Sequence, residues 1–201
     1  MRNDAFISKY FQEMEEIIGV LSREDIDNIV ELLFETWKRG GTVFIIGNGG
    51  SASTATHFAC DLAKGTIVDE KPRFKVMSLT DNVPLTSAWT NDSGFSNLFS
   101  EQLRGFITEG DVLIALSVHG GVGEDKAGPW SQNIIKAMQL AKEHKALTVG
   151  FSGFDGGVMK DIADACVVVP YPSTPHVESF HLALEHLICS CLREKIAFHP
   201  F

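Results

Sequence analysis

Short apolar segments rich in β-branched residues alternate with longer helical patterns along most of this chain. This alternation constrains the fold more than any other feature of the sequence. Strands are expected at residues 42–46, 74–79, 112–117, 146–151 and 165–169. Helices are expected after the first strand through about residue 64, then over 83–91, 95–105, 131–143 and 157–162, and from about 175 to 194. Strands that alternate with helices predict a parallel sheet covered by helices on both faces.

The first forty residues predict a helical extension in front of the sheet. Ile17, Ile18 and Leu21 fall at helical spacing, and Ser22 with Asp25 indicates an N-cap that opens a second helix. The pair Gly40-Gly41 ends that helix. A length of 201 residues suits one domain, so we expect residues 1–201 to form a single domain, with residues 1–40 as its N-terminal helices.

Composition excludes several classes of protein. The chain has 17 Lys and Arg against 26 Asp and Glu, a net charge of −9, which disfavours binding to a nucleic-acid backbone. No apolar run approaches the ~20 residues that cross a bilayer, so no membrane partner is expected. The acidic N-terminus does not resemble a secretory signal, and the expected location is the cytoplasm. Four cysteines without a CxxC pair indicate neither a disulfide framework nor a zinc knuckle, and we expect them in the core.

The loop after the first strand is the first candidate for binding. It reads Gly47-Asn48-Gly49-Gly50-Ser51, which combines residues that tolerate positive φ with a hydroxyl at a helix start. Backbone N–H groups in such a loop can hold an anion or sugar hydroxyls. The loop matches neither the dinucleotide fingerprint nor a P-loop. A tight turn without a ligand remains the alternative.

His57 and Asp61 follow on the same expected helix. The spacing of four residues places an imidazole and a carboxylate on one helix face. Such a pair suits two metal ligands or an acid–base pair, and a helix-stabilising surface contact is the alternative.

Several segments spread along the chain match one known pattern. They are GNGGSASTATHFACDLAKGT, SLTDN, TNDSGFSNLF, EGDVLIALS, SQNIIKAMQLAK and STPHVESFHLALEH. Together they resemble the SIS (sugar isomerase) domain family, specifically its sedoheptulose 7-phosphate isomerases, or phosphoheptose isomerases, and the resemblance covers nearly the whole chain. It implies an α/β fold with a doubly wound, flavodoxin-like sheet of five parallel strands. It also implies a homotetramer with active sites at subunit interfaces, in which the N-terminal helices make oligomer contacts.

The reaction that this resemblance implies is an aldose–ketose isomerisation. Sedoheptulose 7-phosphate becomes D-glycero-D-manno-heptose 7-phosphate through a cis-enediol, for nucleotide-activated heptose and surface polysaccharide. By resemblance, Asp61 matches the catalytic base and His186 the acid–base group. Some members carry zinc, and the matching ligands here are His57, Asp61, Glu178 and His186. The residues implied or expected in substrate binding are Asn48, Gly49, Ser51, Asp92, Ser117, His119, Ser131 and Glu178.

This chain departs from the family pattern in three places. Asp61 is one methylene shorter than the family Glu, and catalysis is sensitive to a shift of about an ångström. Glu178 replaces a Gln, which adds a charge that strengthens a Zn²⁺ site or, without metal, offers a second base. The phosphate loop reads Ser117-Val118-His119 instead of a hydroxyl-rich segment, and an insertion, Val122–Trp130, precedes Ser131.

The departures leave open what the chain binds. His119 or Lys126 can replace lost hydroxyls by charge. The insertion is either a lid over the sugar or an ordinary surface or contact loop. The alternatives to the heptose reaction are isomerisation of another phosphosugar and a non-catalytic module that binds a phosphosugar or a protein. His181 is either structural or supports the site, and His144, His176 and His199 are expected to be exposed.

Overall fold

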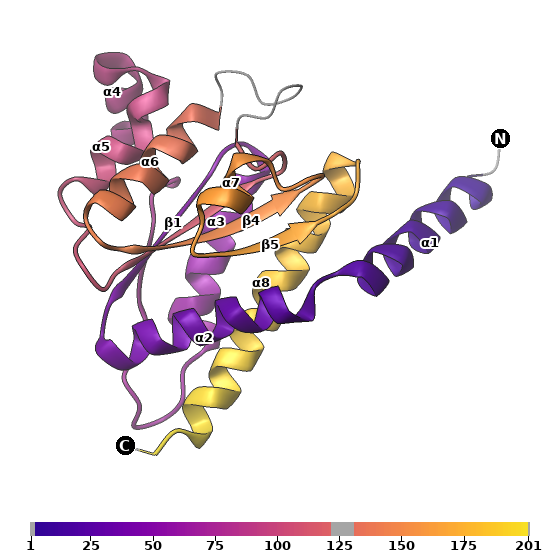
Figure 1. Cartoon of the computed structure of the whole chain (residues 1–201), viewed down its shortest axis with the longest axis horizontal. Coiled ribbons are helices and arrows are strands. Elements are labelled where there is room, and N and C mark those ends of the chain that lie inside the picture. The colour runs from indigo at the N-terminus through magenta and orange to yellow at the C-terminus, as the bar shows by residue number, and fades with distance from the viewer. Residues whose placement is uncertain (1–2, 122–130, 201) are drawn as a thin grey trace.

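A parallel sheet of five strands forms the centre of the molecule (Figure 1). The structure is a computed structural model, and it describes residues 3–121 and 131–200. The strand order is β2-β1-β3-β4-β5, so the predicted doubly wound parallel sheet is confirmed. The strands are β1 (Thr42–Gly47), β2 (Lys75–Ser78), β3 (Val112–Ser117), β4 (Leu147–Gly153) and β5 (Ala165–Val169).

Helices cover both faces of the sheet. One face packs against α2 (Arg23–Arg39), α3 (Gly50–Cys60) and α8 (Thr174–Phe198). The other packs against α4 (Val83–Ser93), α5 (Leu98–Leu103), α6 (Gln132–Glu143) and α7 (Gly157–Ile162). The central strand β3 supplies both cores: Ile114 and Leu116 face the first layer, and Leu113 and Ala115 face the second. Burial on both faces explains why this strand is a continuous apolar run.

The strand order fixes where a ligand can bind. The chain leaves β1 toward β2 on one side, and then returns to place β3 on the other side of β1. The connections after β1 and β3 therefore diverge, and a crevice opens between them at the carboxyl ends of the strands. The glycine-rich loop and Ser117 both lie at this edge of the sheet.

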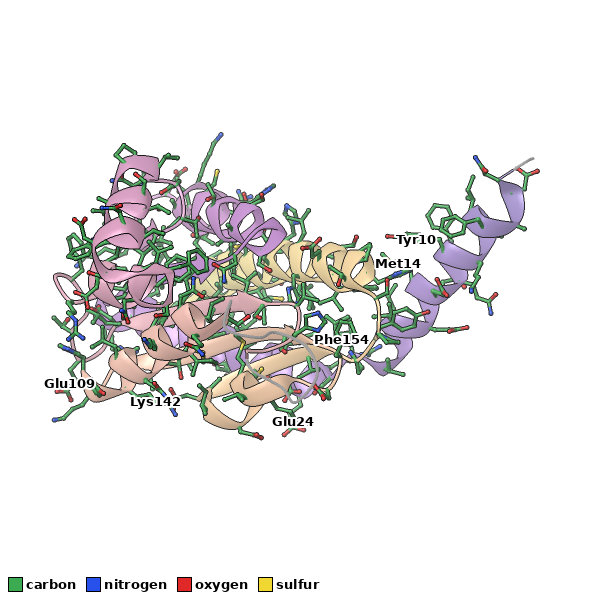
Figure 2. The ribbon with its side chains drawn as sticks, turned by 90° about the horizontal axis from the view of Figure 1, so that it is seen from above. Tyr10, Met14, Glu24, Glu109, Lys142 and Phe154 are labelled. Carbon is green, nitrogen blue, oxygen red and sulfur yellow. The ribbon has the colours of Figure 1, made fainter. Side chains whose placement is uncertain are left out.

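The two N-terminal helices differ in how they contact the body. Ser22 accepts a hydrogen bond from the Asp25 backbone N–H at 3.1 Å, and Gly40 ends α2 at a φ of 73°, as the sequence predicted. In contrast, α1 (Asp4–Val20) projects away from the body (Figures 1 and 2). It exposes large apolar side chains that a lone chain does not cover, namely Phe6, Ile7, Phe11, Ile18 and Val20.

Some elements differ from the sequence prediction. The helix expected over 95–105 is a 3₁₀ turn, η2 (Phe95–Asn97), followed by the short α5. The helix that carries His57 ends in a π-helical turn, η1 (Asp61–Gly65). The last helix runs four residues beyond its expected end. The expected burial of all four cysteines is wrong for Cys60, which is exposed. Within the described residues, no helix is long and apolar enough to cross a membrane.

Candidate active site

The glycine-rich loop after β1 is held in place by its neighbours. The side-chain amides of Asn48 and Asn133 exchange two hydrogen bonds, of 3.0 and 2.9 Å, which tie the loop to α6. Gly49 adopts a φ of 55°, which favours glycine. Gly50 leaves room for Glu178, because a Cβ at Gly50 would lie 2.3 Å from the Glu178 Oε1 atom. The loop therefore brings the start of α3 against the first turns of α8.

A hollow of about 150 Å³ lies at the crevice between β1 and β3. Its wall includes the amino-terminal ends of α3 and α6, at Ser51 and Ser131. Helix amino termini present free N–H groups and a partial positive charge, so this wall suits an anion. Together with three apolar residues, the lining consists of Asn48, Ser51, Ser117, His119, Ser131 and Glu178.

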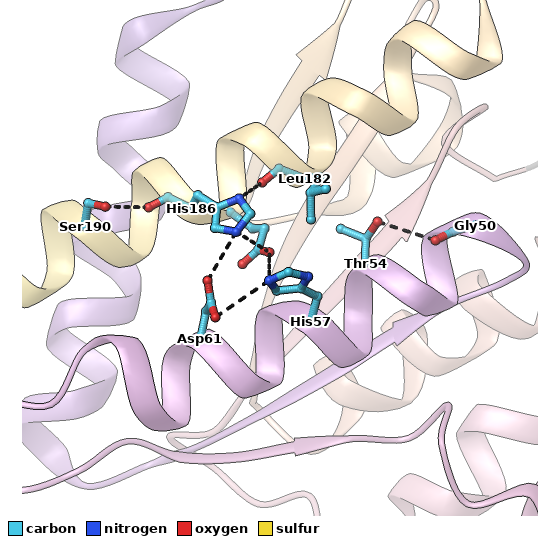
Figure 3. A network of polar contacts seen from close by, with 8 residues as sticks. Gly50, Thr54, His57, Asp61, Leu182, His186 and Ser190 are labelled. Carbon is cyan, nitrogen blue, oxygen red and sulfur yellow. Dashed lines mark hydrogen bonds and ion pairs between the residues drawn. The ribbon is translucent and has the colours of Figure 1, made fainter.

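Further along α3, two ionisable side chains face α8. His57 and Asp61 lie one turn apart, and the His57 Nε2 atom is 3.8 Å from Asp61 Oδ1 (Figure 3). The π-helical turn begins at Asp61, and π-turns occur often at functional sites. The helix thus presents an imidazole and a carboxylate toward the same point.

The helix α8 completes a four-residue cluster. His186 Nε2 lies 3.5 Å from Asp61 Oδ2 (Figure 3). Glu185 Oε1 lies 3.8 Å from the Nε2 atoms of both His57 and His186. The His186 Nδ1 atom donates to the Leu182 carbonyl at 2.8 Å, because a carbonyl can only accept. This bond leaves Nε2 to face the cluster, free to accept a proton or bind an ion.

Glu185 is the unusual member of the cluster. Its side chain is fully buried, and neither carboxylate oxygen accepts a hydrogen bond from the described residues. Burial, with a smaller contribution from the Asp61 charge, raises the pKa of the Glu185 carboxyl to about 8. A buried acid without a partner is costly, so its persistence indicates that another group faces it.

The cluster fits a divalent cation. One ligand atom from each of the four side chains lies within 4.8 Å of the others. In tetrahedral zinc sites, bonds of about 2.0–2.2 Å to nitrogen and oxygen separate the ligand atoms by roughly 3.3 Å. The contacts of 3.5–3.8 Å in the cluster are close to that separation. Imidazole and carboxylate are also the donors that zinc accepts.

The structure divides the predicted site residues into two groups. His57, Asp61 and His186 meet in the cluster, joined by Glu185, which the sequence did not indicate. The hollow collects all but two of the predicted substrate-binding residues, including Glu178, which lies apart from the cluster. Gly49 and Asp92 do not line the hollow, and Asp92 is exposed on α4. The insertion Val122–Trp130, with Lys126, lies outside the described residues.

The remaining histidines have structural surroundings. The buried His181 hydrogen-bonds through Nε2 to the Ser152 carbonyl at 3.1 Å, and burial lowers its pKa to about 4. His144 is exposed as expected, but the expected exposure is wrong for His176, which is buried, and for His199, which is half-buried against Phe34 and Trp37. The His176 ring contacts the rings of Tyr10 and Tyr171, at centroid distances of 4.3 and 5.1 Å, and Glu13 is 3.4 Å from its Nε2 atom. Tyr10 and Glu13 of α1 pack against the start of α8 and help to bury His176. The sequence patterns did not predict this contact between the two helices.

A larger hollow, of about 550 Å³, lies along the outer side of β5. Its lining includes Asp25, Lys160 and Asp164, with part of the α1–α2 connection. It lies on the edge strand, far in strand order from the β1–β3 crevice. We place the chemistry at the smaller hollow, because the ionisable cluster and the diverging connections lie beside it.

Comparison with known proteins gives this arrangement a family. The family model described as the SIS domain matches residues 9–153. A phosphoheptose isomerase from Syntrophotalea carbinolica is 35% identical over 197 residues, which cover 96% of this chain and 95% of the relative. The lincomycin biosynthesis protein LmbN from Streptomyces lincolnensis is 45% identical over 163 residues, which are 79% of this chain and 58% of LmbN.

Solved structures agree with the sequence comparison. The phosphoheptose isomerase GmhA from Neisseria gonorrhoeae superposes with a TM-score of 0.83 at 27% identity. The match covers 96% of this chain and 100% of the other. The shared sheet order, the family match and the level of identity lead to one conclusion: this chain belongs to the SIS domain family, among the phosphoheptose isomerases.

Proposed function

We propose that this protein is an aldose–ketose isomerase that converts sedoheptulose 7-phosphate to D-glycero-D-manno-heptose 7-phosphate for nucleotide-activated heptose. The observation that carries the proposal is the juxtaposition of Asp61 and His186, whose Oδ2 and Nε2 atoms are 3.5 Å apart, on the helices that also line a hollow with two helix amino termini. A carboxylate and an imidazole are the groups that an enediol mechanism needs. We place the reaction in the cytoplasm, where sugar phosphates are made and used.

The spacing of hollow and cluster suits a seven-carbon chain. His57 lies six positions after Ser51 on α3, and His186 lies eight positions after Glu178 on α8. These steps span roughly 9–12 Å along the helix axes. From C1 to the phosphorus of an extended heptulose 7-phosphate, eight single bonds of about 1.5 Å in zigzag cover roughly 10 Å. The phosphate then lies at Ser117 and Ser131 when C1 and C2 reach Asp61.

The side chains account for every proton in the reaction. Asp61 removes a proton from C1 of the ketose while His186 protonates the C2 oxygen, which gives the cis-enediol. His186 then takes the proton of the C1 hydroxyl, and Asp61 returns a proton to C2. The product is the aldose, with atoms and charge conserved. The bond from His186 Nδ1 to Leu182 keeps Nε2 directed at the reacting oxygens.

A zinc ion is part of the proposal. His57, Asp61 and His186 would hold it. Family resemblance implies Glu178 as the fourth ligand, but its carboxylate lies apart from this cluster. When bound, a divalent ion supplies a Lewis acid for the carbonyl oxygen. An imidazole nitrogen that binds an ion carries no proton, so His186 is an acid–base group only in the metal-free protein. Activity after chelation distinguishes these two roles.

We also propose a homotetramer with sites at subunit interfaces. The hollow of about 150 Å³ is smaller than the roughly 300–1,000 Å³ of typical ligand pockets, so further residues have to complete it. Asp92 is exposed on α4, which has no buried residue and is available to a second subunit. The apolar side chains that α1 exposes also suit burial in an oligomer. Sedimentation of an active monomer would contradict this assembly.

Proton NMR in D₂O tests the isomerase directly. The protein, with defined metal content, is incubated with sedoheptulose 7-phosphate, then again after chelation and after return of zinc. We expect an anomeric signal of the aldose with deuterium at C2. Asp61→Asn should lower turnover by about 10²- to 10⁴-fold, because it removes the base but keeps the shape of the side chain. Full activity of the folded Asp61→Asn protein would refute the assignment of the base.

Isomerisation of a different phosphosugar is the second candidate. Two observations favour it: 45% identity to a lincomycin biosynthesis protein, and Val118 and His119 in place of loop hydroxyls. The same NMR experiment with a panel of phosphosugars of five to eight carbons compares the two candidates. Turnover of another sugar, with none of the heptulose, would favour this second candidate. Binding without turnover of any sugar would instead support a non-catalytic module.

A further inference from the structure

Two glutamates of α8 occupy equivalent positions along the contact with α3. Glu178 and Glu185 are seven residues apart, about two helical turns, so both face the same side of α8. Their neighbours on α3, Gly50 and His57, are also seven residues apart. The two helices therefore advance together in the same direction. Their contact has two layers, with one glutamate of α8 in each.

The carboxylates of the two glutamates face different points. Their positions on α8 are about 10.5 Å apart along the axis, and only Glu185 contributes a ligand atom to the four-residue cluster. The Glu178 carboxylate lies over Gly50 and lines the hollow with Ser51. Glu185 instead approaches the two imidazoles at 3.8 Å. A metal bound in the His57 layer thus has Glu185 beside it and Glu178 two turns away.

The surroundings of Glu185 point to a cation. The side chain is fully buried, and neither oxygen accepts a hydrogen bond from a described residue. The second carboxylate of the cluster, Asp61, and the two imidazoles face the same point. Two carboxylates with two neutral imidazoles balance the charge of a divalent ion. A buried carboxylate that meets a cation recovers the hydration that it lost on burial.

We propose that Glu185 is the fourth ligand of a divalent-metal site with His57, Asp61 and His186, and that Glu178 belongs to the substrate pocket. This inference rests on the proposed metal dependence, but it changes the ligand set that family resemblance implies. In the pocket, the carboxylate of Glu178 accepts hydrogen bonds from sugar hydroxyls. Because the negative charge of Glu178 repels a phosphate, the phosphate of the substrate has to bind on the side of Ser117 and Ser131.

A matched pair of variants tests the division between the two glutamates. Zinc affinity is measured by competition with a chromophoric chelator for the full-length protein, Glu185→Ala and Glu178→Ala, since alanine has no side-chain oxygen that could bind zinc. We expect Glu185→Ala to weaken zinc binding by at least about 10- to 100-fold, the loss seen even when residues behind a ligand are changed. Glu178→Ala should change zinc affinity less than about threefold. The reverse order, or equal effects, would overturn the proposal.

A crystal structure of the zinc-loaded wild type provides a test that needs no variant. The anomalous signal of zinc should lie within bonding distance of Glu185, His57, Asp61 and His186. Zinc bonded to Glu178 would overturn the proposal even if Glu185→Ala failed to fold. Far-ultraviolet circular dichroism establishes the folding of each variant before affinity is measured.

The outcomes separate this inference from the proposed function. Turnover of the sugar by a protein that binds no zinc would support the isomerase and overturn the ligand assignment. Zinc affinity that falls as expected, without turnover of any phosphosugar, would support the ligand assignment and overturn the isomerase. The zinc measurement does not depend on identifying the substrate.

Discussion

Replacing His181 with Gln should make the stability of this protein less sensitive to acid. The His181 side chain is only 1% exposed, and its Nε2 atom donates to the Ser152 carbonyl at 3.1 Å. Its ring meets Phe151 edge-on, at a centroid distance of 5.9 Å. Burial disfavours the charged imidazolium and lowers the pKa of His181 from 6.5 to about 4 in the folded protein.

The magnitude follows from the two pKa values. Between pH 6.5 and about 4, the unfolded chain binds a proton at His181 and the folded chain does not. Acid therefore favours the unfolded state, and stability falls as the pH falls. Each pKa unit corresponds to about 1.36 kcal/mol, so His181 alone accounts for a loss of about 3 kcal/mol across this range. Above pH 6.5 the imidazole is neutral in both states and has no effect.

Urea unfolding at several pH values between 7.5 and 4 measures this loss. Wild type and His181→Gln are compared at one protein concentration, because assembly also affects apparent stability. The Gln amide can donate to the same carbonyl but does not titrate. Any constant cost of the substitution cancels when each protein is compared with itself at pH 7.5. Parallel loss of stability in the two proteins would refute the reasoning.

Three further substitutions have defined consequences. Gly50→Ala should raise KM for the sugar phosphate about tenfold in steady-state kinetics. The alanine Cβ would lie 2.3 Å from the Glu178 carboxylate and would displace that carboxylate from the hollow. An unchanged KM would contradict this expectation. Asp111→Ala should lower the free energy of unfolding by roughly 2–4 kcal/mol in urea, since its buried carboxylate accepts three hydrogen bonds of 2.7–2.9 Å. Gly120→Ala should cost more than about 2 kcal/mol by the same assay, because φ is 63° and a Cβ would lie 1.9 Å from a backbone carbonyl oxygen. Gly105→Ala is its control, with no atom within 4 Å; equal losses for the two would rule out the steric explanation.

The sheet could be predicted from the sequence because its strands are buried on both faces. Continuous β-branched runs bounded by glycine and polar residues are typical of buried parallel strands. All five expected strands are present, and the bounds of β3 and β5 agree with the prediction. The structure of segment 95–105 could not be predicted from the segment alone, because contacts with residues distant in sequence help to determine it. Lys136, on α6, bonds to Ser96 and Asn97 in the 3₁₀ turn.

The cluster could be predicted only in part. His57 and Asp61 share a helix face by spacing. Resemblance added His186, which is in the cluster, and Glu178, which lies outside it. The sequence did not indicate Glu185 as a member of the cluster, because adjacent residues of a helix point about 100° apart. A neighbour of His186 is therefore not expected to reach the same point. The available signal was an acidic residue beside His186, within a run of α8 that is otherwise apolar from Leu182 to Cys189. Such a residue has to find a partner inside the protein.

The ionisable cluster stands on two helices, while most of the hollow beside it is built from the ends of strands and their connections. Loops tolerate substitution and insertion far better than packed helices do. Evolution or an engineer can therefore alter the connections after β1 and β3 to accept a new sugar without rebuilding α3 and α8. Under the proposed mechanism, the residues that transfer protons stay on a fixed pair of helices, while substitutions in the loops around the hollow change which sugar binds.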